Sequence, residues 1–318
     1  MLWDNYPEIK RKLEKVENII ERNLKCRSKP LEELLQTLSG GGKMLRPAFT
    51  VISSHFSRQW NDKIYEAAAG IEILHMATLV HDDVIDEAGM RRGKPTVNSI
   101  YGDKMSVYVG DYLLSKAVLL LSGTLPEDRL EKIAGALKSI CEAEIEQFFS
   151  RFNPDVSLVT YLKRIGRKTA ALFAFSCGEG AFLSGCGENV QRNLVKFGFC
   201  FGMAFQMYDD ILNLVGDTGE TGKPKGNDIK EGIITIPFIL TLRKNAEFAK
   251  LARELMSEKT IKDSDIRKLT DEIISSGGID DTRAWIDRYL QKARTALEPL
   301  PDIREKEIFH DIMLTLKK

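Results

Sequence analysis

The sequence predicts an all-α protein, a helical bundle of about ten or more helices. Three observations support this prediction. Apolar residues recur three and four positions apart along most of the 318-residue chain, which is the spacing of one buried helical face. No run alternates apolar and polar residues in the manner of a half-buried strand. The breaks are short and no Pro-rich or Ser-rich linker divides the chain, so we expect a single domain over residues 1–318.

The predicted helices follow one another from the N-terminus, and each carries this apolar spacing. They cover residues 13–24, 31–38, 46–56, 65–86, 109–123, 130–152, 158–185, 189–216, 235–256 and 266–300, the last interrupted at 275–278, and a short helix follows. Glycine and proline mark most breaks because neither continues a helix well. Only the break at 216–228 is long; its four glycines predict a loop with a function of its own.

Composition narrows the function classes. Lys plus Arg and Asp plus Glu both number 46, so the net charge is zero, whereas nucleic-acid-binding proteins usually carry a basic excess. The five cysteines include no C-x-x-C pair, and we interpret them as reduced thiols of a cytoplasmic protein rather than a zinc site. The N-terminus lacks the apolar core of a signal peptide, and no run of about 18 uncharged apolar residues predicts a transmembrane segment.

The segment HDDVIDEAGMRRGKP, residues 81–95, places three aspartates at the end of an apolar helix. At about 100° per residue, its acids share one stripe with other side chains: Glu72, His75, Leu79, Asp82, Asp83 and Asp86. Carboxylates this close repel one another unless a positive group lies among them. A solvated helix end is the simpler alternative, but acids at a helix C-terminus oppose the helix dipole, which favours a ligand site.

A second segment, FQMYDDILN at 205–213, repeats the arrangement. Its polar side chains lie at i, i+3, i+4 and i+7, again on one helical face: Gln206, Asp209, Asp210 and Asn213. Each acid segment is followed by a basic stretch that contains glycine, RRGKP at 91–95 and TGKPKG at 221–226. Two matched units of this kind predict a cavity with acidic walls and cations at its mouth.

An anion bound between acidic walls requires a bridging cation. Mg²⁺ accepts carboxylate oxygens and commonly carries phosphate oxygens as well, and arginine and lysine then meet the outer phosphate oxygens. The residues therefore predict a diphosphate held by Mg²⁺, with an apolar remainder in the core of the bundle. An EF-hand loop and a Walker loop are excluded, because neither motif occurs in the sequence.

These segments resemble motifs of the trans-polyprenyl diphosphate synthases, in the same order. HDDVIDEAGMRRGKPTVN is similar to their first aspartate-rich motif and FQMYDDILN to the second, while GGGKMLRP resembles their G-K-x-x-R-P segment and RKTAALF their Lys-Thr segment. The resemblance implies an all-helical bundle around a deep central cavity, usually a homodimer. It also implies Mg²⁺-dependent condensation of an allylic diphosphate with isopentenyl diphosphate.

The resemblance assigns roles position by position. Mg²⁺ would be held by Asp82, Asp86 and Asp209, supported by Asp83 and Asp210. The allylic diphosphate, or the cation that develops from it, would be contacted by Arg91, Lys168, Thr169, Gln206 and Lys223. Isopentenyl diphosphate would be bound by Lys43, Arg46, His75 and Arg92. Asn213 departs from the family pattern, which usually has aspartate there, and this puts the outermost metal contact in doubt.

Product length is implied by Ala77 and Thr78, about one turn before Asp82. Short-chain relatives often have Phe or Tyr there, so the small side chains imply a medium or long product of roughly 25 to 50 carbons, with Phe148 or Phe149 closing the tunnel. Release of such a product would bring transient contact with a membrane. Two alternatives stay open: a class I terpene cyclase, which needs no second diphosphate site, and a subunit of a two-component synthase that requires an accessory partner.

Overall fold

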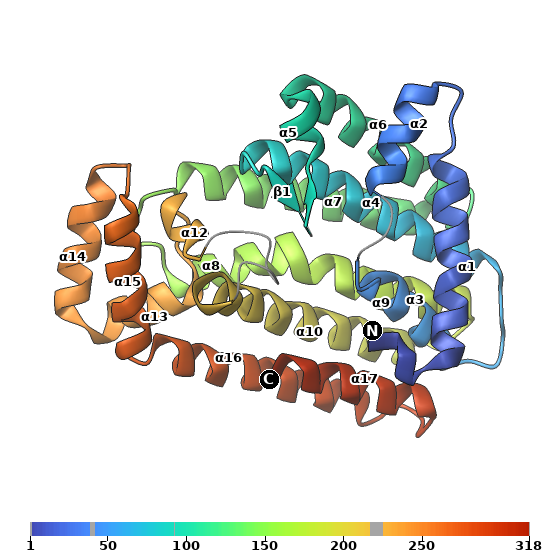
Figure 1. Cartoon of the computed structure of the whole chain (residues 1–318). Coiled ribbons are helices and arrows are strands. Elements are labelled where there is room, and N and C mark those ends of the chain that lie inside the picture. Colours follow the sequence, from blue (N-terminus) through green and yellow to red (C-terminus); the bar gives the residue numbers. More distant parts are fainter. Residues whose placement is uncertain (1, 39–41, 92, 217–224, 318) are drawn as a thin grey trace. The chain divides into compact units, whose positions relative to one another are not determined.

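The computed structural model describes residues 2–38, 42–91, 93–216 and 225–317, and helices make up nearly all of its regular structure (Figure 1). The all-α prediction is confirmed. The helices up to the middle of the chain are α1 (Pro7–Leu24), α2 (Lys29–Leu38), α3 (Leu45–Ser54), α4 (Lys63–Ile85), α5 (Val97–Tyr101), α6 (Asp103–Ser122), α7 (Glu127–Phe149), α8 (Leu158–Ile165) and α9 (Ala171–Leu183). Those that follow are α10 (Glu188–Val215), α12 (Asn227–Lys230), α13 (Ile236–Lys244), α14 (Ala246–Ser257), α15 (Asp263–Ser275), α16 (Gly278–Leu297) and α17 (Arg304–Leu314).

The chain divides into two compact units. The first contains Met1–Ala134, Leu172–Gly198 and Ala296–Ile308, and the second contains Gly135–Ala171, Phe199–Thr295 and Phe309–Lys318. The first acid segment therefore belongs to the first unit and the second acid segment to the second. The prediction of a single domain stays a prediction.

The first unit is organised around α4, which is buried along most of its length. Helix α1 packs against α4 with residues spaced three and four apart, the pattern of one apolar face: Ile9, Leu13, Val16, Ile20 and Leu24. On another side α6 comes close at Gly70, where an added Cβ would lie 2.8 Å from the Leu121 side chain. This close packing fixes the helix whose end carries the first aspartates.

A buried ion pair joins α7 to α9 in this unit. The Arg129 guanidinium donates to Glu179 Oε1 at 3.1 Å and to Gln191 Oε1 at 2.8 Å, and it lies 4.0 Å from the centre of the Phe182 ring. Glu179 is only 1% exposed. Burial raises the pKa of its carboxyl to about 7, even though the attraction of Arg129 opposes the rise.

Glu179 is expected to make stability depend on pH. Its pKa is about 7 in the folded chain against 4.5 ordinarily, so its stabilising contribution is complete below pH 4.5 and is lost as the pH rises through 7. Urea unfolding of the wild type and Glu179→Gln at about pH 5 and about pH 8 measures the loss. The wild type should lose about 2 to 3 kcal/mol relative to the variant between these pH values. If the difference in unfolding free energy between the wild type and the variant is the same at both pH values, the pKa of the Glu179 carboxyl is not raised.

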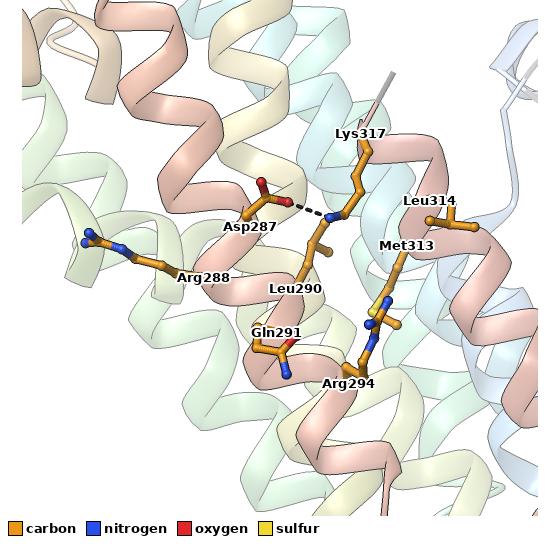
Figure 2. Close-up of a pocket in the computed structure, with 8 residues that line it drawn as sticks. All are labelled: Asp287, Arg288, Leu290, Gln291, Arg294, Met313, Leu314 and Lys317. Carbon is orange, nitrogen blue, oxygen red and sulfur yellow. Dashed lines mark ion pairs between the residues drawn. The ribbon is translucent and has the colours of Figure 1, made fainter.

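The second unit packs α8 and the later part of α10 with the helices from α12 to α16. Its buried rings include Phe238 and Phe248, whose centres lie 5.0 Å apart. Asn245 caps α14, because its side-chain oxygen accepts from the Phe248 N–H at 3.0 Å. Figure 2 shows a pocket of this unit whose lining includes the Asp287–Lys317 ion pair. The pocket has a volume of about 350 Å³, and none of the described site residues lines it.

Several local features depart from the sequence prediction, including the division of the predicted helix at 235–256 into α13 and α14 at Asn245. An antiparallel ribbon, β1 (Met90–Arg91) and β2 (Lys94–Pro95), forms where only a break is predicted, with Gly93 at a φ of 75° in its turn. The predicted helix at 158–185 is interrupted by a π-helical turn at Gly166–Ala170. Apolar spacing averaged over a long segment is insensitive to them, because each involves only a few residues.

Helix α6 qualifies the expectation that no segment crosses a membrane. By length and composition alone, it is long and apolar enough to do so, and 33% of its apolar stretch is buried in the protein. Its outward side carries large exposed apolar side chains, including Met105, Tyr108 and Leu119. The absence of a transmembrane segment therefore stays a prediction.

Candidate active site

The first acid segment forms the end of α4. The Asp86 N–H donates to the Asp82 carbonyl oxygen at 2.8 Å, so the two residues stand one helical turn apart. Both side chains are partly exposed, whereas Asp83 is 5% exposed. The helix end thus presents Asp82 and Asp86 together and turns Asp83 inward.

The basic stretch after α4 folds back onto the inward aspartate. Arg91 Nε donates to Asp83 Oδ1 at 2.6 Å, and the Thr96 hydroxyl donates to the Ala88 carbonyl oxygen at 2.6 Å, which closes the ribbon β1–β2 onto the helix end. A guanidinium has five N–H donors, so one held this way still has N–H groups for a diphosphate. The acid-then-base pattern is therefore one folded unit. Arg92 lies outside the described residues.

The residues predicted to bind isopentenyl diphosphate also belong to the first unit. Lys43 is exposed, and its carbonyl oxygen accepts from the Trp3 indole N–H at 2.7 Å. The Arg46 guanidinium lies 4.7 Å from the centre of the Phe173 ring. His75 is partly exposed on α4, on the same helical side as Asp82 seven residues later. Arg46 and His75 are carried by α3 and α4, which pack against each other.

The second acid segment is held by hydrogen bonds among α8, α10 and the π-helical turn. The Tyr161 hydroxyl donates to Asp210 Oδ2 at 2.6 Å. Gln206 Nε2 donates to Asp210 Oδ1 at 3.1 Å, and Gln206 Oε1 accepts from the Thr169 hydroxyl at 2.6 Å. Asp210 is 4% exposed, and burial raises the pKa of its carboxyl although these hydrogen bonds lower it. Asp209, one position earlier, is partly exposed.

The two aspartate pairs are therefore built alike. In each, the first aspartate, Asp82 or Asp209, is partly exposed. The second, Asp83 or Asp210, is buried and accepts hydrogen bonds from the protein. This division separates a partly exposed carboxylate from a buried one that is held by its neighbours.

The carboxylate donors at the end of α4 suit a metal ion that carries other ligands of its own. Within the ranges that the structure describes, no three His, Cys, Asp or Glu side chains gather closely enough to hold a metal by themselves. Mg²⁺ in phosphate sites takes one or two carboxylates and completes its shell with phosphate oxygens and water. Asp82 and Asp86, at the end of α4, provide such a pair. The residues present fit Mg²⁺ that arrives with a diphosphate.

Lys168 lies in the π-helical turn and is paired with an acid on α7. Its Nζ lies 2.7 Å from Glu144 Oε1, with side-chain exposures of 30% and 19%. The preceding Arg167 donates to both carboxylate oxygens of Glu146, at 3.0 and 2.6 Å. Turns of this kind redirect side chains relative to an α-helix and are frequent at functional sites. Helix α7 thus fixes the turn that carries Lys168.

Asn213 ties the end of α10 to the start of α12. Its side-chain oxygen accepts from the Asp228 N–H at 3.2 Å, and its carbonyl oxygen accepts from the Gly226 N–H at 2.8 Å. The amide that replaces the family's aspartate therefore has a structural use. Lys223, predicted to contact the allylic diphosphate, lies outside the described residues.

The residues predicted to set product length differ in their surroundings. Ala77 is 2% exposed in α4, whereas Thr78 is partly exposed and donates from its hydroxyl to the His75 carbonyl oxygen at 2.8 Å. Phe148 and Phe149 are 59% and 81% exposed. Neither side chain is buried in this chain, and the expectation that one of them closes the product tunnel stays a prediction.

Among the residues that contact the predicted site, Tyr161 and Glu144 were not found from the sequence. Tyr161 is 49 positions from Asp210, and no local spacing connects residues that far apart. The available signal was a tyrosine on the apolar side of a helix that leads into the Lys-Thr segment, since a buried tyrosine hydroxyl usually requires a hydrogen-bond partner.

The fold and these residues define a class: all-helical enzymes of the isoprenoid synthase type, with paired aspartates on two helices. A heptaprenyl diphosphate synthase from Staphylococcus aureus superposes with a TM-score of 0.93 at 33% identity, covering 97% of this chain and 98% of that one. A polyprenyl synthase from Caulobacter crescentus, solved with calcium and isoprenyl diphosphate, gives a TM-score of 0.92 at 31% identity over 97% and 95%.

Sequence comparison makes the assignment specific. The profile of the polyprenyl synthetase family matches residues 28–273. Component 2 of the heptaprenyl diphosphate synthase of Geobacillus stearothermophilus is 34% identical over 304 residues, which cover 95% of this chain and 94% of that protein. The chain belongs to the polyprenyl synthetase family.

Proposed function

We propose that the chain is a Mg²⁺-dependent prenyltransferase that condenses an allylic diphosphate with isopentenyl diphosphate, to a trans-polyprenyl diphosphate of roughly 25 to 50 carbons. The observation that carries the proposal is the folded unit at the end of α4. Two partly exposed carboxylates, Asp82 and Asp86, stand one turn apart, and Arg91 is fixed beside them by the buried Asp83. Carboxylates next to a positioned arginine suit a cation-bound diphosphate. The calcium and isoprenyl diphosphate of the Caulobacter relative support the same chemistry.

The family resemblance assigns Asp82, Asp86 and Asp209 to the cofactor. When bound, Mg²⁺ neutralises negative charge on the diphosphate leaving group. Arg91, Lys168 and Lys223 would meet the remaining charge as the carbon–oxygen bond breaks.

Two sets of side chains would handle the organic partners. Thr169 and Gln206, joined by a 2.6 Å hydrogen bond, would face the allylic cation with oxygen atoms. Isopentenyl diphosphate would be oriented so that its double bond attacks that cation, by Lys43, Arg46, His75 and Arg92. The proton lost afterwards would pass to the departed diphosphate.

In the wild type, Glu144 is expected to weaken the binding of the allylic diphosphate, because its carboxylate neutralises part of the positive charge of Lys168. Glu144→Gln should therefore lower the Michaelis constant for the allylic substrate by roughly two- to fivefold, the value of a partly exposed ion pair. Glu142→Gln, on the same helix with a 52% exposed side chain, is the matched control. Lys168→Ala should raise the constant. If Glu144→Gln raises it too, Glu144 orients Lys168 rather than competing for it.

The assembly proposed is a homodimer. Large apolar side chains stand exposed on α6 and on α5 before it, a patch that a second copy would bury: Ile100, Tyr101, Met105, Tyr108 and Leu119. Because the Geobacillus relative is named a component 2, a complex with an accessory subunit is the second candidate. The cytoplasmic location stays a prediction.

Incorporation of labelled isopentenyl diphosphate tests the proposed function. The purified chain is incubated with farnesyl diphosphate and Mg²⁺, with and without EDTA. Metal-dependent incorporation into an extractable lipid is expected. Cyclised hydrocarbon without incorporation would identify a terpene cyclase, and incorporation only after a partner protein is added would identify a two-component synthase.

A further inference from the structure

We propose that Tyr161 is a positioning residue for the allylic half of the site. It acts through Asp210 on Gln206 and on the turn that carries Lys168 and Thr169. This inference rests on the proposed function, because the role of that turn comes from it.

The first residue in this series of hydrogen bonds is a tyrosine on α8. Tyr161 is 2% exposed, so it does not reach a substrate itself. Its hydroxyl donates to Asp210 Oδ2 at 2.6 Å, a short bond of the kind made to an ionised carboxylate. The backbone of Ile236, at the start of α13, also favours the ionised form of the Asp210 carboxyl and so opposes the rise in its pKa that burial causes. The Asp210 carboxylate therefore joins α8 to α10.

The other oxygen of Asp210, Oδ1, links Tyr161 to Gln206 and the π-helical turn. It accepts from Gln206 Nε2, which turns the amide oxygen of Gln206 toward the Thr169 hydroxyl. Thr169 follows Lys168 directly in the π-helical turn. The hydrogen bonds thus run from Tyr161 to Asp210, Gln206 and Thr169, and a change at Tyr161 reaches the allylic contacts. None of these residues belongs to the set predicted for isopentenyl diphosphate.

Tyr161→Phe removes the hydroxyl and keeps the ring. The variant is expected to lower kcat/KM for the allylic substrate by roughly 10- to 100-fold, the usual effect of losing a group that orients a site residue. The Michaelis constant for isopentenyl diphosphate should stay unchanged. Tyr65→Phe, at a buried tyrosine of the first unit that is 6% exposed, is the control and should behave as wild type. Equal losses for both substrates, or no loss, would overturn the proposal.

A binding measurement separates positioning from support of the fold. The thermal midpoint is recorded with and without Mg²⁺ plus inorganic diphosphate, because a ligand that binds the folded state raises it. Tyr161→Phe should give a smaller ligand-induced rise than wild type. A lower ligand-free midpoint with an unchanged rise would show a structural role only and would overturn the proposal.

The double variant Tyr161→Phe, Asp210→Asn tests the route through Asp210. If Tyr161 acts through that carboxylate, the double variant loses no more allylic kcat/KM than Asp210→Asn alone, whereas multiplied losses would mean independent effects and overturn the route. If Tyr161→Phe does not fold, Asp210→Asn carries the test and must show the same loss confined to the allylic substrate. A wild type without incorporation would instead sink the proposed function, which distinguishes the two failures.

Discussion

Alanine in place of Asp82 or Asp209 is expected to lower turnover by on the order of a thousandfold or more, because each removes a carboxylate that would hold the cation on the leaving group. Both side chains are partly exposed and their neighbours Asp83 and Asp210 are buried. The loss should therefore appear in the rate with little change in stability.

The controls for this prediction come from the same chain. Asp280→Ala, at an 82% exposed aspartate of α16, should leave turnover unchanged. Asp83→Ala should instead lower stability as well as turnover, because it leaves Arg91 without its carboxylate. Steady-state rates and unfolding midpoints of the variants test these expected losses of turnover and stability. Near-normal turnover of Asp82→Ala, or of the wild type in EDTA, would contradict a metal site at these residues.

Tyrosine at Ala77 is expected to change the product rather than the chemistry. Ala77 lies five residues before Asp82 on α4, and a large side chain there would stand beside the growing chain without replacing a carboxylate. The product should shorten to roughly 15 or 20 carbons while the first condensation continues. Chromatography of the dephosphorylated products measures the change.

The burial of Ala77 calls for a companion variant. The side chain is 2% exposed, so the larger ring would cost about 1 to 3 kcal/mol if the surrounding residues cannot move. Thr78→Tyr starts from a partly exposed position on the same helix and should shorten the product with a smaller loss of stability. Wild-type product lengths in both folded variants would show that other residues set the length.

The fold and the aspartate segments could be predicted from the sequence because both depend on local spacing. Apolar residues three and four apart predicted the helices, and the same rule placed Asp82 and Asp86 one turn apart. The rule could not separate Asp82 from Asp83, since both fall in one stripe of the helix. The structure separates them through Arg91, which the ribbon β1–β2 returns to Asp83.

The remaining features depend on contacts between distant parts of the chain. The Lys168–Glu144 pair connects the π-helical turn to α7, and the Tyr161–Asp210 bond spans 49 positions. The exposure of Phe148 and Phe149 could not be predicted for the same reason. An apolar run alone does not show whether a side chain faces the core or a surface that a partner covers.

The mass of the product made by the purified chain alone is the decisive measurement for the proposed function. With farnesyl diphosphate, excess isopentenyl diphosphate and Mg²⁺, we expect a series of linear prenyl diphosphates that ends between roughly 25 and 50 carbons. A product that ends at about 15 or 20 carbons would contradict the proposed length. The absence of any elongated product, in a chain that is folded and supplied with metal, would contradict the proposal that it is a self-sufficient prenyltransferase.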